Sequence, residues 1–259
     1  MLSKNKIKQI QSLNRKKFRD ESGLFLVEGN KMVEEAIRSE FRIHTIVCTS
    51  DFLNSHPEIN SMTEELFETE NDFIQKASLL QNPQDSLAIV YIPENTKPNF
   101  SPDKELILAL DFIQDPGNLG TILRIADWFG IKNIVCSENS ADVYNPKVVQ
   151  SSMGAIFRVR TSYLNLGNFL NDANKSRVPV YGTHLEGKNI YTEKLSENGI
   201  LVLGNEGSGI SESISRLVSQ KLFIPSFSTE INKPESLNVA IATAICCSEF
   251  RRRQENQRT

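Results

Sequence analysis

Apolar runs alternate with amphipathic segments along the second half of the chain. Each run has the length and the β-branched content of a buried strand, and most are followed by residues at helical spacing. The predicted strands are 105–113, 133–137, 156–161, 178–183, 199–204 and 221–225. The predicted helices are 117–130, a short one near Asn145, 165–175, 211–219 and 234–252. This alternation predicts an α/β domain whose mostly parallel sheet is covered on both faces.

The first ninety residues predict a smaller α/β unit. Its strands are expected at 23–29, 43–49 and 86–92. Its helices are expected at 3–19, at 30–40 with Asn30 as N-cap, and over 62–68 and 72–80. Three prolines and no hydrophobic periodicity mark 93–104 as a linker. We therefore expect an N-terminal domain over 1–92 and a C-terminal domain over 105–259.

Composition limits the classes of protein to which this chain can belong. Of the 259 residues 39% are hydrophobic and 24% are charged, which is typical of a globular protein. No stretch is apolar enough to span a membrane, and the N-terminus lacks the apolar core of a secretion signal. The four cysteines have no CxxC spacing, and the three histidines are scattered. The expectation is a reduced, metal-free cytoplasmic protein.

Charge is distributed unevenly along the chain. The net charge is only −3, yet residues 1–19 hold no acidic residue. The basic residues of this stretch are Lys4, Lys6, Lys8, Arg15, Lys16, Lys17 and Arg19. Such a segment on an acidic body is typical of a local nucleic-acid contact. A solvated basic helix without a partner is the alternative.

The loop after the strand at 105–113 is unusual. Pro116 favours a helix start, while Gly117 and Gly120 leave room for close approach to the backbone and Asn118 can cap or bond outward. Arg124 lies off the predicted buried stripe of this helix, which is Ile122, Ile125, Ala126 and Phe129. An anionic partner such as phosphate would explain a cation near a helix N-terminus. An ordinary solvated arginine is the alternative.

Two later loops have a similar character. Gly204, Gly207 and Gly209 surround Glu206 directly after the strand at 199–204, which allows a ligand to lie against backbone amides or simply forms a tight turn. A dinucleotide site is disfavoured, because too few residues follow. Ser236 and Asn238 stand at the entrance of the last helix, where Ser236 is the simplest N-cap. Ligands of open parallel sheets lie at the carboxyl ends of strands, which is where all three loops are expected.

Taken together and in this order, the three loops resemble the three motifs of the SpoU/TrmH family of RNA ribose 2′-O-methyltransferases. The stretches are DPGNLGTILRIADWFG, LVLGNEGSGIS and IPSFSTEINKPESLNVAIATAI. The segment VVQSSMGAIFRV, at 148–159, is similar to the family's region between the first two motifs. The N-terminal GLFLVEGNKMVEEAI resembles the family's RNA substrate-binding domain.

The resemblance implies a fold, a cofactor and a site. The fold would be a trefoil-knotted parallel-sheet methyltransferase domain with a smaller N-terminal α/β substrate-binding domain. The cofactor would be S-adenosylmethionine (SAM), and the enzyme would be a homodimer acting on RNA, with ribosomal RNA favoured over transfer RNA. The implied functional positions are Arg124, Asn118, Glu206, Ser236 and Asn238. The implied SAM-binding positions are Leu203, Gly204, Asn205, Ile224 and Leu237. Arg15, Lys16, Lys17 and Arg19 would bind RNA.

Two other functions remain open from the sequence. The third motif departs from the family pattern, because its loop is longer and has no glycine. An RNA-binding assembly factor that has kept the fold and lost catalysis is one alternative, although the presence of Arg124, Glu206, Ser236 and Asn238 speaks against it. A nicotinamide-dependent reductase is the other and weaker one, because Tyr191 and Lys194 are spaced YxxK rather than YxxxK.

Overall fold

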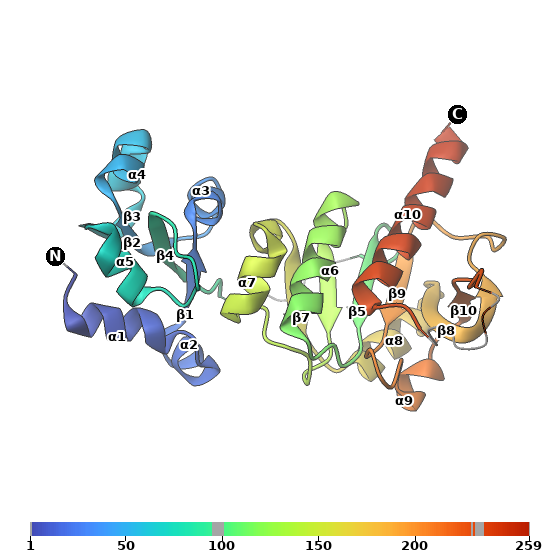
Figure 1. Cartoon of the computed structure of the whole chain (residues 1–259). Coiled ribbons are helices and arrows are strands. Elements are labelled where there is room, and N and C mark those ends of the chain that lie inside the picture. Colours follow the sequence, from blue (N-terminus) through green and yellow to red (C-terminus); the bar gives the residue numbers. More distant parts are fainter. Residues whose placement is uncertain (1, 95–100, 229, 231–235, 259) are drawn as a thin grey trace. The chain divides into compact units, whose positions relative to one another are not determined.

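The computed structural model describes residues 2–94, 101–228, 230 and 236–258 (Figure 1). Half of the predicted linker and part of the third-motif loop lie outside these residues. The chain forms two compact units. One comprises 1–96 and 142–158, and the other comprises 97–141 and 159–259.

The larger unit is built on a six-stranded sheet in the order β10-β8-β9-β5-β6-β7. Every neighbouring pair is parallel, as the alternating pattern predicted. The strands are β5 (Leu106–Leu110), β6 (Asn133–Cys136), β7 (Arg160–Tyr163), β8 (Val180–Asn189), β9 (Gly199–Leu203) and β10 (Gln220–Phe223). The central β5 and β9 are buried at every position, which explains why their sequences read as continuous apolar runs.

Helices cover the large sheet. They are α6 (Pro116–Trp128), α8 (Leu166–Lys175), α9 (Glu212–Ser215) and α10 (Val239–Arg258). Apolar side chains of α8 and α9, among them Leu170 and Ile214, share one core with β5, β6, β8 and β9. Figure 1 shows α10 beside α6, and the Arg251 guanidinium donates to the carbonyl of Phe129 at the end of α6. On β8, the ring of Tyr181 packs edge-on against Phe250 of α10.

The smaller unit contains a four-stranded sheet in the order β1-β4-β2-β3. The strands are β1 (Leu24–Glu28), β2 (Ile43–Cys48), β3 (Thr63–Glu68) and β4 (Ser86–Tyr91). Its helices are α1 (Lys4–Ser12), α2 (Lys16–Ser22), α3 (Asn30–Ile37), α4 (Ser50–Ser55), η1 (Pro57–Ser61) and α5 (Asn71–Ala77). Ile10 and Leu13 of the N-terminal segment pack with Ile74 of α5 over β1, β2 and β4.

A segment from the middle of the chain completes the smaller unit. It carries α7 (Pro146–Ser152) and η2 (Ala155–Phe157), and the sequence division placed it in the C-terminal domain. The Phe25 ring contacts Tyr144 at 4.8 Å and Phe157 at 6.5 Å between centroids. An ion pair also joins Arg158 to Glu35. The chain therefore passes between the two units three times.

Three local predictions were wrong. The expected single helix over 3–19 is two helices, α1 and α2, separated by a turn. Residues 63–68, expected to be helical, form strand β3. Gly29 rather than Asn30 is the N-cap of α3, and the Asn30 side chain instead donates to Asp85.

Candidate active site in the parallel-sheet unit

Hydrogen bonds join the three loops singled out in the sequence. The Asn118 Nδ2 donates to Glu206 Oε1 at 2.6 Å, and the Asn238 Nδ2 donates to Asn118 Oδ1 at 3.0 Å. The Asn118 side chain thus bonds two residues that are distant in the sequence, one 88 and the other 120 positions later. One polar cluster therefore unites the loops that follow β5 and β9 with the entrance of α10.

Helix capping positions two of these side chains, Asn118 and Asn238. Asp115 is the N-cap of α6 and accepts from the backbone N–H of Asn118 at 2.8 Å, so the Asn118 amide is not needed as a cap. Asn238 caps α10, because its Oδ1 accepts from the N–H of Ala240 at 2.9 Å while its Nδ2 bonds Asn118. The alternative of Ser236 as N-cap is wrong, since the helix begins three residues later at Val239. Ser236 is exposed near the same entrance.

Arg124 is exposed on α6, off the buried face formed by Leu119, Ile122, Leu123 and Ala126. It makes no hydrogen bond or ion pair with any residue in the described part of the chain. Trp128 lies one turn further on the same face and is 84% exposed. The arginine's five donors are therefore available to an anion or to a reacting oxygen.

The second loop is held by Asn205. Its Oδ1 accepts from the N–H groups of Gly207 and Ser208 at 2.9 and 3.2 Å, and its Nδ2 donates to the carbonyl of Phe112 at 3.0 Å. Asn205 and Gly209 also form an isolated antiparallel bridge. At Gly204 a Cβ atom would lie 2.1 Å from the Gly209 carbonyl carbon, so glycine is required there. The turn is rigid, and it presents Glu206 to Asn118.

Three of the expected cofactor positions are apolar residues at the end of a strand or at the entrance of α10. Leu203 ends β9 and is fully buried, while Ile224 follows β10 and is half-buried. Leu237 is 49% exposed although it is adjacent to the capping Asn238. Such apolar side chains are chemically suited to the apolar faces of an adenosine group. The residues present thus fit a SAM site of the implied type.

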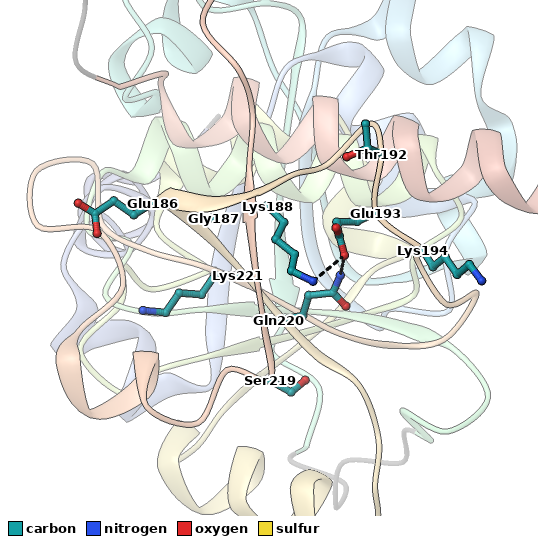
Figure 2. Close-up of a pocket in the computed structure, with 9 residues that line it drawn as sticks. All are labelled: Glu186, Gly187, Lys188, Thr192, Glu193, Lys194, Ser219, Gln220 and Lys221. Atoms are coloured by element: carbon teal, nitrogen blue, oxygen red, sulfur yellow. Dashed lines mark hydrogen bonds and ion pairs between the residues drawn. The ribbon is translucent and has the colours of Figure 1, made fainter.

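A groove of about 670 Å³ lies elsewhere on the parallel-sheet unit (Figure 2). Lys188 and Gln220 both bond Glu193 within it, while Lys194 and Lys221 point away from each other. None of the predicted site residues lines this groove. Its mixed charges do not converge on one ligand.

The predicted RNA-binding residues separate into two groups. Arg15, Lys16 and Lys17 are exposed. Arg19 is 1% exposed, and its guanidinium donates to Asp142 and to the carbonyls of Leu13 and Asn14. Such a buried, fully paired arginine is unavailable to phosphate, so we leave Arg19 out of the RNA-binding set.

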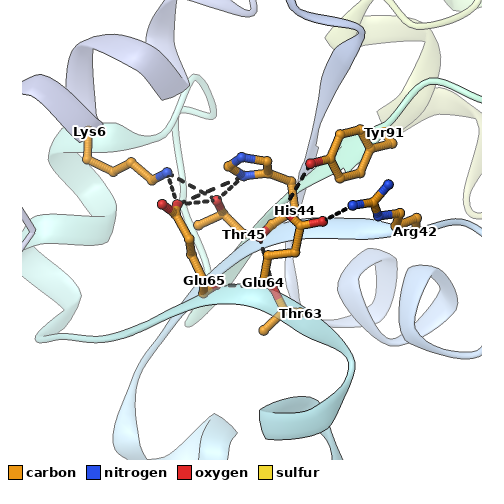
Figure 3. Close-up of polar contacts among 8 residues, drawn as sticks. All are labelled: Lys6, Arg42, His44, Thr45, Thr63, Glu64, Glu65 and Tyr91. Atoms are coloured by element: carbon orange, nitrogen blue, oxygen red, sulfur yellow. Dashed lines mark hydrogen bonds and ion pairs between the residues drawn. The ribbon is translucent and has the colours of Figure 1, made fainter.

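Lys6 is also removed from the basic surface (Figure 3). Its ammonium group pairs with Glu65 and donates to the Thr45 hydroxyl at 3.1 Å. The hydrogen bond from Lys6 holds the pKa of the Glu65 carboxyl below its usual value. Beside this cluster, Arg42 stacks on Tyr91 and pairs with Glu64. The exposed positive charge of the N-terminal segment is therefore smaller than the sequence indicated.

Other chemistries find little support in the described residues. No group of three or more histidine, cysteine, aspartate or glutamate side chains there is arranged to hold a metal ion. All four cysteines are buried, and burial raises the pKa of the Cys48 thiol to about 11, so a thiolate nucleophile is disfavoured. No helix in the described ranges is both long and apolar enough to cross a membrane.

Two family models match the chain. Residues 105–248 match the SpoU rRNA methylase family, and residues 4–88 match the MRM3-like substrate-binding domain. Among curated proteins, the 23S rRNA (guanosine(2553)-2′-O)-methyltransferase RlmP of Bacillus subtilis is 30% identical over 247 residues. This alignment covers 95% of this chain and 96% of that protein.

Solved structures agree with these matches. A TrmH-family RNA methyltransferase from Porphyromonas gingivalis superposes with a TM-score of 0.87 and 41% identity, covering 98% of this chain and 99% of that one. The AdoMet-bound rRNA methyltransferase from Sinorhizobium meliloti has a TM-score of 0.82 and 29% identity, with 98% and 97% coverage. The fold, the order of the loops and the match over 105–248 together show that this chain belongs to the SpoU rRNA methylase family.

Proposed function

We propose that this protein transfers the methyl group of SAM to a ribose 2′-hydroxyl in ribosomal RNA, of the 23S type. The observation that supports it best is the Glu206–Asn118–Asn238 hydrogen-bonded cluster, which unites all three motif loops in the parallel-sheet unit. The relative from Bacillus subtilis, which aligns over 95% of this chain, is a 23S rRNA methyltransferase. An exposed arginine without a partner in the described residues stands on the helix that begins at this cluster.

The chemistry requires the 2′-oxygen to meet an electrophilic methyl group in line. When bound, SAM supplies that methyl on a sulfonium; the carbon–sulfur bond breaks as the oxygen–carbon bond forms, and the hydroxyl proton leaves to solvent or to an RNA phosphate. Arginine is a poor base, because the guanidinium group holds its proton strongly. The role of Arg124 here is to stabilise the developing alkoxide and to bind the adjacent phosphate. Asn118, Glu206, Ser236 and Asn238 orient the ribose.

The cofactor would be held by the ends of β9 and β10 and by the entrance of α10. Leu203, Gly204 and Asn205 supply the rigid turn, while Ile224 and Leu237 supply apolar contacts. We propose that the chain around this site is threaded as a trefoil knot, in keeping with the family resemblance. The carboxyl ends of parallel strands are the usual position for such a ligand.

The remaining parts of the chain serve the RNA and the oligomer. Residues 1–92 would bind RNA through Arg15, Lys16 and Lys17, and residues 105–259 would carry out methylation, joined by the linker at 93–104. Trp128 of α6 and Ile241 of α10 are exposed on neighbouring helices, and we propose that they form a homodimer interface. We propose that the protein acts in the cytoplasm.

The test is methyl transfer from labelled SAM to total RNA from a strain that lacks the protein. The RNA is then separated into its size classes, and each class is digested with alkali. Label in an alkali-stable dinucleotide from 23S rRNA is the expected result, since a methylated 2′-oxygen cannot cleave its neighbouring bond. Label confined to transfer RNA would contradict the substrate class. Absence of both transfer and SAM binding would favour an RNA-binding assembly factor without catalysis.

A further inference from the structure

Phe112 has a backbone conformation that a bulky residue rarely adopts. Its φ is 61°, in the left-handed region. The other non-glycine residues with positive φ in the described part of the chain are Met153 and Arg177. Both follow the last turn of a helix, where a left-handed residue is a common ending. Phe112 follows the buried strand β5 instead, so its conformation needs another explanation.

Contacts on both sides hold Phe112 in place. Its N–H donates to the Ser137 hydroxyl at 2.8 Å, and its carbonyl accepts from Asn205 Nδ2 at 3.0 Å. On one flank Asp111 is 6% exposed and accepts from the Ser211 N–H at 2.7 Å. On the other flank Ile113 is fully buried. These backbone bonds and the buried neighbours hold the left-handed conformation, while the Phe112 side chain remains partly exposed.

The backbone of Phe112 is linked to the loop that carries the polar cluster of the proposed site. Phe112 is 37% exposed between two buried neighbours. Its carbonyl is bonded by Asn205, the residue directly before Glu206, which in turn bonds Asn118. Glycine would adopt this backbone without strain. A strained, exposed aromatic residue at the edge of a reactive cluster is the pattern expected where the side chain itself contacts a ligand.

We propose that the Phe112 ring is a stacking surface for an unpaired base of the RNA whose ribose is methylated. The inference rests on the proposed function and adds a substrate-contacting residue to it. Proteins that act on single-stranded RNA splay bases out and stack them on aromatic side chains. The backbone of Phe112 is already held by two hydrogen bonds, so little backbone freedom is lost when a base stacks on the ring. Phe112 thereby sets the position of the nucleotide relative to Asn118 and Arg124.

The test compares Phe112→Gly, Phe112→Tyr and the wild-type enzyme on the same RNA from a strain that lacks the protein. Phe112→Gly is expected to reduce kcat/KM for methyl transfer by about tenfold to a hundredfold, the loss typical of one base stack. Its Tm should equal or exceed that of the wild type, because glycine relieves the left-handed strain. SAM affinity should be unchanged. Phe112→Tyr should retain transfer within about twofold, because the ring is kept.

Met153→Gly is the matched control, since Met153 is also left-handed and 38% exposed, in the smaller unit. The Tm of Met153→Gly should likewise equal or exceed that of the wild type, and its kcat/KM for methyl transfer should be unchanged. Phe112→Gly with wild-type transfer would overturn the proposal, as would Phe112→Tyr falling as far as Phe112→Gly. A lower Tm with weakened SAM binding would assign the ring to packing instead. If the wild-type enzyme itself transfers no methyl group, the proposed function fails rather than this inference.

Discussion

At the scale of single residues, Arg124 carries the largest chemical role in the proposed mechanism. The sequence placed it off the buried stripe of its helix, and the structure leaves it exposed. Replacing it with alanine should lower the rate of methyl transfer by about a hundredfold or more, because one donor to a developing oxyanion is worth that much.

The Arg124→Ala variant should keep its Tm and bind SAM within about twofold of the wild type. The measurement is single-turnover transfer alongside calorimetric SAM binding. Arg216→Ala is the control, as this arginine is exposed on the same unit and pairs only with Glu212 in the described residues. Loss of SAM binding in Arg124→Ala would contradict the assigned role.

Glu28 makes a residue-scale prediction about pH. Burial raises the pKa of its carboxyl above the ordinary value, and the hydrogen bonds from Ser78 and Leu79 offset this only in part. The stability that this group contributes is therefore fully present below its unfolded pKa and lost as pH rises through its folded pKa. Glu28→Gln keeps an oxygen that accepts both bonds but cannot ionise.

The Tm of Glu28→Gln minus that of the wild type should accordingly increase between about pH 4 and pH 7. Thermal unfolding at several pH values measures it. A difference that is constant with pH would show that the carboxyl titrates normally in the folded protein.

At the scale of elements, some features could be predicted and others could not. The continuous apolar runs of β5 and β9 mark buried parallel strands, and both were located correctly. The edge strand β3 pairs with β2 and exposes Glu64 and Glu65, so its sequence lacks a clear apolar face.

The break between α1 and α2 has no glycine or proline. At this break the Arg19 guanidinium donates to the carbonyls of Leu13 and Asn14. The same guanidinium bonds Asp142, which is 123 residues later in the chain. Local sequence patterns do not show such a contact.

The same limit applies to the candidate site. The position of its loops after buried strands followed from the alternating pattern, since parallel strands end at one edge of a sheet. The pairing of Asn118 with Glu206 and Asn238 depends on strand order, which single-sequence patterns leave open. The hydrogen bonds by which Asn205 holds its turn, and the positive φ of Phe112, depend on the backbone conformation. Neither can be predicted from the amino-acid composition or from the hydrophobic pattern.

Asn238 joins an element to the site, because it both caps α10 and bonds Asn118. Asn238→Asp keeps the capping oxygen but loses the Nδ2 donor. It should retain a Tm near that of the wild type while methyl transfer falls at least tenfold. Asn238→Ala loses both functions and should in addition lower the free energy of unfolding by about 1 kcal/mol. Equal loss of stability in the two variants would show that the bond to Asn118 is structural only.

At the scale of the whole molecule, the protein combines a basic N-terminal segment with an acidic body. The structure narrows the exposed basic set by burying Lys6 and Arg19 in ion pairs. Reversing Lys16 and Lys17 to glutamate should weaken RNA binding and reduce the slope of log affinity against log salt by about 1 to 2, because fewer counterions are released. Filter binding over a range of salt concentrations measures this slope.

The control for that experiment reverses two exposed lysines of the other unit, Lys175 and Lys221, which gives the same change in net charge. It should leave the slope close to that of the wild type. A slope that is insensitive to Lys16 and Lys17, or equally sensitive to both pairs, would place the RNA-binding surface elsewhere.

We propose that the three loops form one site for ribose methylation of ribosomal RNA. The most direct measurement is a map of 2′-O-methylation over all RNA in cells that lack the protein, read from resistance to alkaline cleavage. Such cells should lose methylation at a 23S rRNA ribose, and the wild-type gene should restore it while Arg124→Ala should not. An unchanged 23S rRNA map, or a loss of methylation confined to transfer RNA, would show that the protein does not methylate ribosomal RNA.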